Sequence, residues 1–163
     1  MSTATLHLGD AACTEAAGAR LAAELRGGMI VTLSGDLGAG KTTLARGCLR
    51  ALGWRGSVKS PTYALVEHYE VSSLYFYHFD FYRFADPGEW EHLGFADYFR
   101  QDAICMIEWP ERVDGMLPAP DLMLTLRYPV SGMQDGRELA MLSRSSAGDR
   151  CLSAIATRGS PVT

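Results

Sequence analysis

The sequence has little lysine and no excess of positive charge. Of its 15 basic residues only Lys41 and Lys59 are lysines, and 19 acidic residues give the 163-residue chain a net charge of −4. Proteins that bind nucleic acid tightly on their own neutralise many phosphates with basic side chains. The charge balance therefore argues against autonomous binding to nucleic acid, although a partner protein can supply such a surface.

Cysteine is also scarce, and long apolar runs are absent. No two cysteines form a Cys-x-x-Cys pair and no histidine stands at zinc-ligand spacing, so neither a zinc site nor a disulfide framework is indicated. We expect the cysteines to be small buried apolar residues in a reducing compartment: Cys13, Cys48, Cys105 and Cys151. No segment approaches the run of about 18 apolar residues that a membrane span needs, and no basic segment followed by an apolar run opens the chain. These absences predict a cytoplasmic protein without a membrane segment.

The most informative stretch that is present is Gly35-Asp-Leu-Gly-Ala-Gly-Lys-Thr42, which fits the pattern G-x-x-x-x-G-K-[ST]. Glycines in this pattern let backbone N–H groups turn onto phosphate oxygens, where a Cβ would clash. We expect Lys41, exposed in the nucleotide-free loop, to reach the β- and γ-phosphates, and the Thr42 hydroxyl to ligate Mg²⁺. The N-terminus of the following helix favours an anion. The expected nucleotide-binding residues are Gly38, Ala39, Gly40, Lys41, Thr42 and Thr43.

The spacing of apolar residues predicts an α/β fold. A buried strand over 29–33 precedes the loop, and a helix over 42–52 follows it. Further strands are expected over 5–8, 63–69, 74–79, 103–107, 121–128 and 137–143, and further helices over 12–25, 94–100 and 146–157. A turn with Gly132 and Gly136 joins the last two strands into a hairpin. We therefore expect one domain over 1–163, a P-loop NTPase-like three-layer sandwich with a mostly parallel central sheet and an antiparallel C-terminal hairpin.

Two acidic residues follow apolar runs, where an α/β protein can hold Mg²⁺. Asp80 follows Tyr77-His-Phe79, and Glu108 follows Ile104-Cys-Met-Ile107. Ligands of open α/β sheets bind beyond the C-terminal ends of the strands, and nucleotide hydrolysis needs an oriented metal and water. We prefer Glu108 as the metal-linked carboxylate because its run is the more fully apolar. A helix cap or a surface carboxylate is the alternative for each, and which of the two positions the attacking water stays open.

Other residues give weaker signals. Ser60 and Thr62 flank a proline downstream of the loop, where many phosphate-loop enzymes keep a nucleotide-sensing segment, but a simple turn fits as well. Trp109 follows Glu108 and is expected either beside the nucleotide or in the core. His78 has no partner at ligand spacing, so we expect a structural role for it.

Three readings of the phosphate loop compete. Guanine specificity in the common GTPases needs an N-K-x-D motif. Neither Lys41 nor Lys59 stands in such a motif, so the sequence favours ATP over GTP. A small-molecule kinase would need an arginine-bearing lid, and no loop of this chain gathers arginines. A non-catalytic nucleotide-sensing scaffold would need no water-positioning group, so Asp80 and Glu108 argue against it. An ATPase is the reading that uses all these residues.

Five blocks of the sequence resemble the bacterial tRNA threonylcarbamoyladenosine biosynthesis ATPase family TsaE, also called YjeE. They are Thr14…Gly18-x-Arg20-Leu, Ser34-Gly-Asp-Leu-Gly-Ala-Gly-Lys-Thr-Thr43, Ser60-Pro-Thr-Tyr63, His78-Phe-Asp-Phe-Tyr-Arg83 and Ile107-Glu-Trp-Pro-Glu111. The resemblance runs from Asp10 to about Pro120, and nothing is carried over beyond Val130. Phe81 and Phe84 stand where leucines are commoner in the family, which affects packing at most.

The resemblance implies a small Mg²⁺-dependent ATPase in the threonylcarbamoylation of adenosine 37 in tRNAs that read ANN codons. Hydrolysis in that family does not make the modification but allows multiple turnover of the transferase complex, and it depends on the partner subunits TsaD and TsaB. Activity alone should be weak, and tRNA should be contacted only through the partners. The cofactors implied are ATP and Mg²⁺. The catalytic residues implied are Lys41, Glu108 and Asp80, the metal-linked residues Thr42 and Glu108, and the switch or partner-linked residues Ser60, Thr62 and Trp109.

Overall fold

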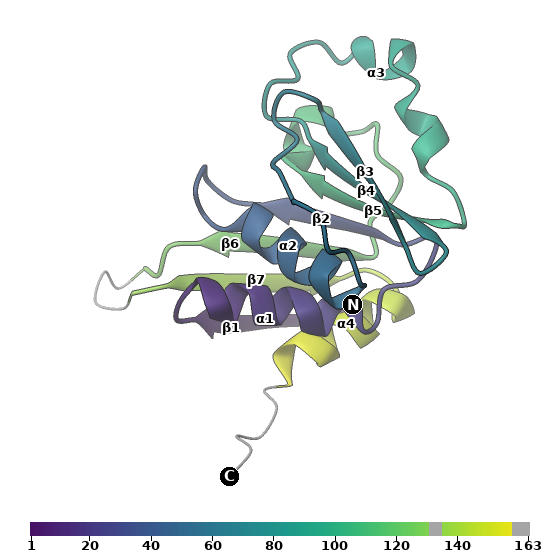
Figure 1. Ribbon diagram of the computed structural model, residues 1–163. Coiled ribbons are helices and arrows are strands. Elements are labelled where there is room, and N and C mark those ends of the chain that lie inside the picture. The colour runs from purple at the N-terminus through teal and green to yellow at the C-terminus, as the bar shows by residue number, and fades with distance from the viewer. Residues whose placement is uncertain (131–134, 158–163) are drawn as a thin grey trace.

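The computed structural model describes residues 1–130 and 135–157, which form a mixed α/β sheet of seven strands with helices (Figure 1). The strands are β1 (Thr3–Leu8), β2 (Ile30–Ser34), β3 (Val66–Val71), β4 (Leu74–Asp80), β5 (Ala103–Glu108), β6 (Leu122–Arg127) and β7 (Arg137–Ser143). The helices are α1 (Ala11–Ala22), α2 (Lys41–Ala51), α3 (Glu89–His92) and α4 (Ser146–Ala156), with 3₁₀ turns η1 (Phe95–Tyr98) and η2 (Pro110–Val113). Within these residues no helix is both long and apolar enough to cross a membrane.

The sheet has a parallel centre and antiparallel edges. Its strand order is β1-β7-β6-β2-β5-β4-β3. Strand β2 pairs in parallel with β5 and β6, and β5 pairs in parallel with β4. The predicted C-terminal hairpin is present as β6–β7, while β1–β7 and β3–β4 are further antiparallel pairs that the sequence did not predict. Gly136 directly precedes β7, whereas the predicted turn residue Gly132 lies outside the described residues.

Helices α1, α2 and α4 pack against one face of the sheet through an aliphatic core (Figure 1). Helices α1 and α2 approach closely because two glycines leave room for the neighbouring backbone. A Cβ on Gly18 would run into the Leu44 carbonyl oxygen, and a Cβ on Gly47 would run into that of Glu15. Packing therefore explains why Gly18 stands in the first of the family-like blocks. Through this close contact, α1 holds α2 against the sheet.

The opposite face of β4 and β5 carries an aromatic cluster. Phe79 on β4 packs edge-on against Phe95, with ring centroids 5.8 Å apart, and Phe81 packs against Phe95 at 5.4 Å. The segment with α3 and η1 brings Trp90 and Phe95 onto this face. The aromatic side chains on this face of β4 and in the segment after it are therefore part of the core.

Three local expectations are wrong. Strand β3 begins at Val66 instead of residue 63, because the Leu65 N–H donates to the Pro61 carbonyl at 2.8 Å and closes a turn. Helix α1 ends at Ala22, three residues before the predicted end at residue 25. Cys13 is exposed, although the other three cysteines are buried and all four are free.

Candidate functional site

The predicted phosphate loop joins the C-terminal end of β2 to α2. Gly38 and Gly40 have φ angles of 78° and 108°, in the left-handed region that residues with side chains rarely adopt. Gly40 is the N-cap of α2 and supplies no side-chain cap, so the first N–H groups of the helix keep no side-chain acceptor. These donors and the positive end of the helix dipole form an anion-binding end.

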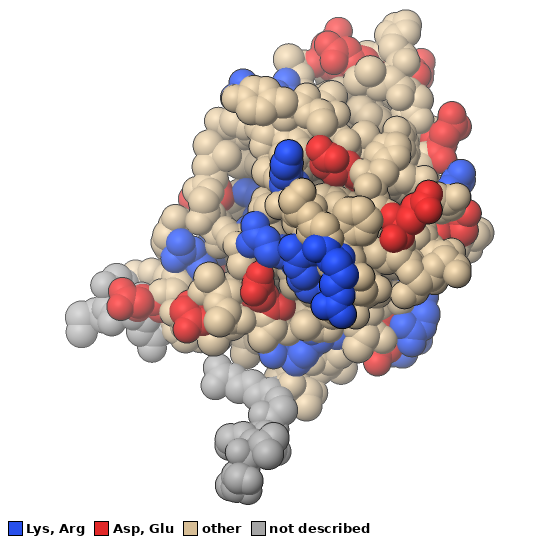
Figure 2. Space-filling view, viewed as in Figure 1, with Lys and Arg blue, Asp and Glu red and all other residues tan. Residues whose placement is uncertain are grey.

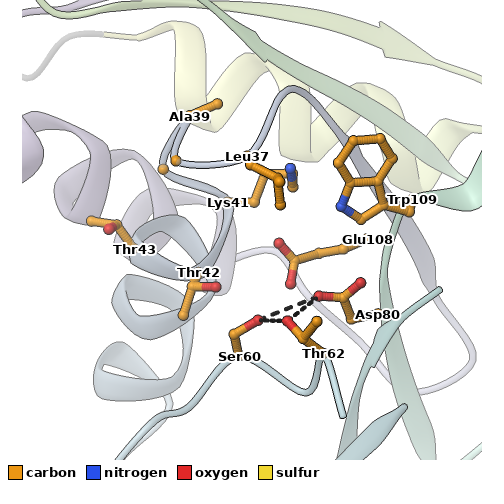
Figure 3. Close-up of a pocket in the computed structure, with 12 residues that line it drawn as sticks. Leu37, Ala39, Lys41, Thr42, Thr43, Ser60, Thr62, Asp80, Glu108 and Trp109 are labelled. Carbon is orange, nitrogen blue, oxygen red and sulfur yellow. Dashed lines mark hydrogen bonds between the residues drawn. The ribbon is translucent and has the colours of Figure 1, made fainter. Parts of the chain in front are cut away.

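A hollow of about 220 Å³ beside this loop brings together every residue predicted for the site (Figure 3). Segments far apart in the sequence contribute to it: the loop and the start of α2, the segment before β3, and the ends of β4 and β5. Its lining is Leu37, Gly38, Ala39, Gly40, Lys41, Thr42, Thr43, Ser60, Thr62, Asp80, Glu108 and Trp109. Leu37 is the one of these that the sequence reasoning did not name.

Lys41 is buried, contrary to the expectation that it would be exposed. Its side chain bends back onto its own loop, where Nζ donates to the Gly35 carbonyl and, at 3.1 Å, to that of Asp36. Burial lowers the pKa of the Lys41 ammonium, and the Glu108 and Asp80 carboxylates partly oppose this shift. The loop carbonyls therefore accept the hydrogen bonds that water would accept from an exposed ammonium group.

The two carboxylates stand side by side at the ends of neighbouring strands. Asp80 and Glu108 are partners in the β4–β5 register and are 3% and 2% exposed. Asp80 accepts hydrogen bonds from Ser60 Oγ at 3.3 Å and Thr62 Oγ1 at 3.1 Å through Oδ2, and from the Tyr82 N–H at 2.9 Å through Oδ1. The Ser60–Thr62 segment is thus hydrogen-bonded to Asp80, a residue that lines the hollow.

Glu108 is held differently, by a residue that the sequence reasoning missed. Nε2 of His78 lies 2.9 Å from Oε2 of Glu108, and His78 is fully buried. The signal available in the sequence was spacing. Because side chains alternate along a strand, His78 faces the same side as Asp80, two residues further on. That clue identifies Glu108 as the partner only once β4 is known to lie beside β5.

Trp109 is half-buried: it lines the hollow and also packs against the aromatic part of the core. Its φ and ψ are 57° and 49°, a left-handed conformation uncommon for a bulky residue. Its ring centroid is 4.6 Å from Lys41 Nζ. The Arg83 guanidinium lies over the exposed ring of Tyr63, with Cζ 4.4 Å from the ring centroid, and among the described residues no arginine lines the hollow.

The donor groups around the hollow fit a nucleotide with Mg²⁺. Residues 1–130 and 135–157 contain no group of three or more His, Cys, Asp or Glu that could hold a metal alone. Mg²⁺ does not require one, because it is usually held by one or two carboxylates together with phosphates and water. Thr42, Asp80 and Glu108 supply such oxygens beside the N–H groups that suit phosphates. The Lys41 ammonium, hydrogen-bonded to loop carbonyls at the hollow, is near enough to donate to a phosphate oxygen, which is a stronger, anionic acceptor.

Comparison with known proteins agrees with these features. The family described as "Threonylcarbamoyl adenosine biosynthesis protein TsaE" matches residues 8–138. The tRNA threonylcarbamoyladenosine biosynthesis protein TsaE of Haemophilus influenzae is 46% identical over 127 residues, 78% of each chain. Its namesake in Bacillus subtilis is 38% identical over 114 residues, 70% of this chain and 71% of the relative. The crystal structure of Bacillus subtilis YdiB aligns with a TM-score of 0.79 at 25% identity, over 95% of both chains. The chain belongs to the TsaE family, as its five sequence blocks suggested.

Proposed function

We propose that this chain is a Mg²⁺-dependent ATPase that supports the threonylcarbamoylation of adenosine 37 in tRNAs reading ANN codons. The ATPase part is carried by one observation, the gathering of the phosphate loop, Thr42 and the Asp80–Glu108 pair around a single hollow. The tRNA-modification part rests on the TsaE family, whose members carry that role in their names.

Each residue then has a definite task. The N–H groups of residues 38–43 hold the phosphates, and Lys41 exchanges its loop carbonyls for phosphate oxygens. Thr42 and Glu108 would hold the metal, which when bound neutralises charge on the phosphates and orients them. Glu108 is the main candidate for positioning the attacking water, and Asp80 the second.

The P-loop NTPase-like three-layer sandwich, as one domain over 1–163, is part of this proposal. It is supported by the parallel order β6-β2-β5-β4, with helices on one face and the aromatic segment on the other. A second hollow, of about 300 Å³, shares Gly38, Ala39, Gly40 and Thr43 with the first and is also lined by Thr14 and Arg137. We place the nucleoside part of ATP there because it adjoins the loop.

Partners belong to the proposal as well. With no arginine lining the hollow in the described residues, charge on the γ-phosphate has little cationic support beyond Lys41. A TsaD–TsaB pair can supply that charge or order the Ser60–Thr62 segment and Trp109. Figure 2 shows basic side chains gathered near the centre of one face, with acidic side chains around them. The net charge of −4 agrees with tRNA contact through the partners, and the four free cysteines agree with a cytoplasmic location.

The test is phosphate release at saturating ATP, measured for the chain alone and with the TsaD–TsaB pair. We expect slow release of ADP and phosphate alone and a faster rate with the pair. An effect of about 10³-fold or more is within the range that a supplied arginine can give. A rate that ignores the pair while a small metabolite becomes phosphorylated would establish a kinase instead. A rate that stays near zero in every mixture would establish a passive nucleotide sensor.

A further inference from the structure

His78 is a polar side chain in an otherwise apolar part of the core. Phe76, Ile104 and Met106 on the same face of β4 and β5 are all fully buried in the aliphatic core beneath the helices. Burying a polar ring among such side chains costs free energy unless the ring is hydrogen-bonded. The one hydrogen-bond partner of the His78 ring in the described chain is Glu108.

The second ring nitrogen shows how this contact is made. Nδ1 of His78 is buried and has no hydrogen-bond partner in the described residues. A proton there would be an unsatisfied buried donor, so the fitting tautomer carries its proton on Nε2 and donates it to Glu108 Oε2. Glu108 lines the hollow, and no protein donor in the described chain is hydrogen-bonded to its second carboxylate oxygen, Oε1. One oxygen is thus fixed from the core side and the other is presented to the site.

We propose that His78 is a positioning residue that fixes the rotation of the Glu108 carboxylate, so that its free oxygen meets the metal or the attacking water. The inference deepens the proposed ATPase function and rests on it, since it gives His78 a task only if Glu108 takes part in hydrolysis. Residues that hold a metal-linked group from behind cost about 10- to 100-fold in activity or metal affinity when removed.

A cross-strand neighbour supplies a matched control. Glu67 stands directly opposite His78 in the β3–β4 register, yet the described chain shows no hydrogen bond between them. Glu67→Gln therefore removes a carboxylate next to His78 in the sheet without touching the proposed contact. It should leave hydrolysis and nucleotide affinity unchanged.

The kinetic test uses the full chain with the TsaD–TsaB pair. His78→Phe keeps a flat ring but removes the donor, and it should lower kcat by about 10- to 100-fold with little change in KM for ATP. His78→Gln restores an N–H near the position of Nε2 and should recover most of the rate. If His78→Gln is as impaired as His78→Phe, or if both act equally on KM and kcat, the positioning role is wrong.

A double-mutant comparison separates positioning from packing. If His78 acts through Glu108, adding His78→Phe to Glu108→Gln causes no further loss of rate. An equal fold-loss in both backgrounds would show a merely structural role and overturn the inference. A Glu108→Gln variant that hydrolyses ATP at the parental rate would make Asp80 the essential carboxylate and would also overturn the inference, because His78 would then have no catalytic group to position.

A spectroscopic readout needs neither turnover nor a folded His78→Phe chain. In ¹⁵N spectra of the four histidines, the His78 signal should show the Nε2-protonated tautomer. That signal should shift in Glu108→Gln and stay in place in Glu67→Gln. An Nδ1-protonated ring, or a signal indifferent to Glu108→Gln, would contradict the inference whatever the enzyme assay gives.

Discussion

The ends of β4 and β5 place two carboxylates side by side, but the molecule holds them in opposite ways. Asp80 is held from the surface, by the hydroxyls of Ser60 and Thr62 and by a backbone N–H. Glu108 is held from the core, by a histidine with no solvent exposure. The neighbouring Tyr63 is 83% exposed, so a partner can reach the loop that holds Asp80.

The two arrangements suit a division of labour between the carboxylates. A carboxylate fixed by a buried ring keeps its direction whatever happens at the surface, which suits a group that orients a metal or a water. A carboxylate hydrogen-bonded to an exposed loop changes its surroundings when that loop is moved. We infer that Glu108 serves the chemistry and that Asp80 links the hollow to the partners.

The largest expected effect comes from removing the core-held carboxylate. Glu108→Ala should lower hydrolysis by about 10²- to 10⁴-fold, as loss of a positioned acid–base group does, while the loop still holds nucleotide. Phosphate release and ATP affinity are measured on the same preparation. The control is Glu111→Ala, which removes an exposed carboxylate outside the hollow. If Glu108→Ala hydrolyses ATP normally, Asp80 is the essential carboxylate and the contrast is reversed.

The next effect concerns Lys41, which both carboxylates influence. Lys41→Ala should weaken ATP binding by about 10- to 100-fold, the equivalent of about 1.5–3 kcal/mol for charge-assisted hydrogen bonds. The fold should survive, because the carbonyls of Gly35 and Asp36 can bind water instead. Calorimetric titration with ATP checks the affinity, with Lys59→Ala as control. Unchanged affinity in a folded Lys41→Ala variant would refute the phosphate-loop assignment.

A smaller effect is expected at the surface-held end. Thr62→Val removes a hydroxyl donor to Asp80 at nearly constant volume and should lower the partner-stimulated rate about fivefold, the equivalent of about 1 kcal/mol. ATP affinity should not change. Ser57→Ala, upstream of the loop, is the control. A Thr62→Val chain that responds fully to the TsaD–TsaB pair would separate Asp80 from partner coupling.

The smallest effect is on stability, and it tests how deeply β5 is buried. Burial raises the pKa of the Cys105 thiol on β5 from 9.0 to about 12. Below pH 9.0 both folded and unfolded chains keep this proton; above it the unfolded chain releases the proton first, so stability falls as pH rises toward 12. Half a unit above pH 9.0 the thiol should cost about 0.8 kcal/mol. The free energies of unfolding of the parent and of Cys105→Ala, measured with denaturant, should converge as pH rises. A difference that stays constant with pH would contradict this burial.

The sequence predicts those parts of the site that depend on local pattern. The phosphate loop is a contiguous motif, and Asp80 and Glu108 were found because each closes an apolar run. The His78–Glu108 contact was missed because it depends on β4 lying beside β5 in a given register. The burial of Lys41 was missed because its acceptors are backbone carbonyls, which every residue has and which therefore leave no signal in the sequence. Contacts that depend on strand pairing, and hydrogen bonds accepted by backbone carbonyls, are therefore the parts of the site that the sequence could not predict.

The most direct test of the division of labour compares Glu108→Gln with Asp80→Asn at saturating ATP, each alone and with the TsaD–TsaB pair. We predict that Glu108→Gln binds ATP but releases almost no phosphate in either condition. Asp80→Asn should keep the slow rate of the chain alone and lose most of the stimulation by the pair. The reverse pattern, with a stimulated Glu108→Gln and a silent Asp80→Asn, would contradict the assignment of chemistry to the core-held carboxylate.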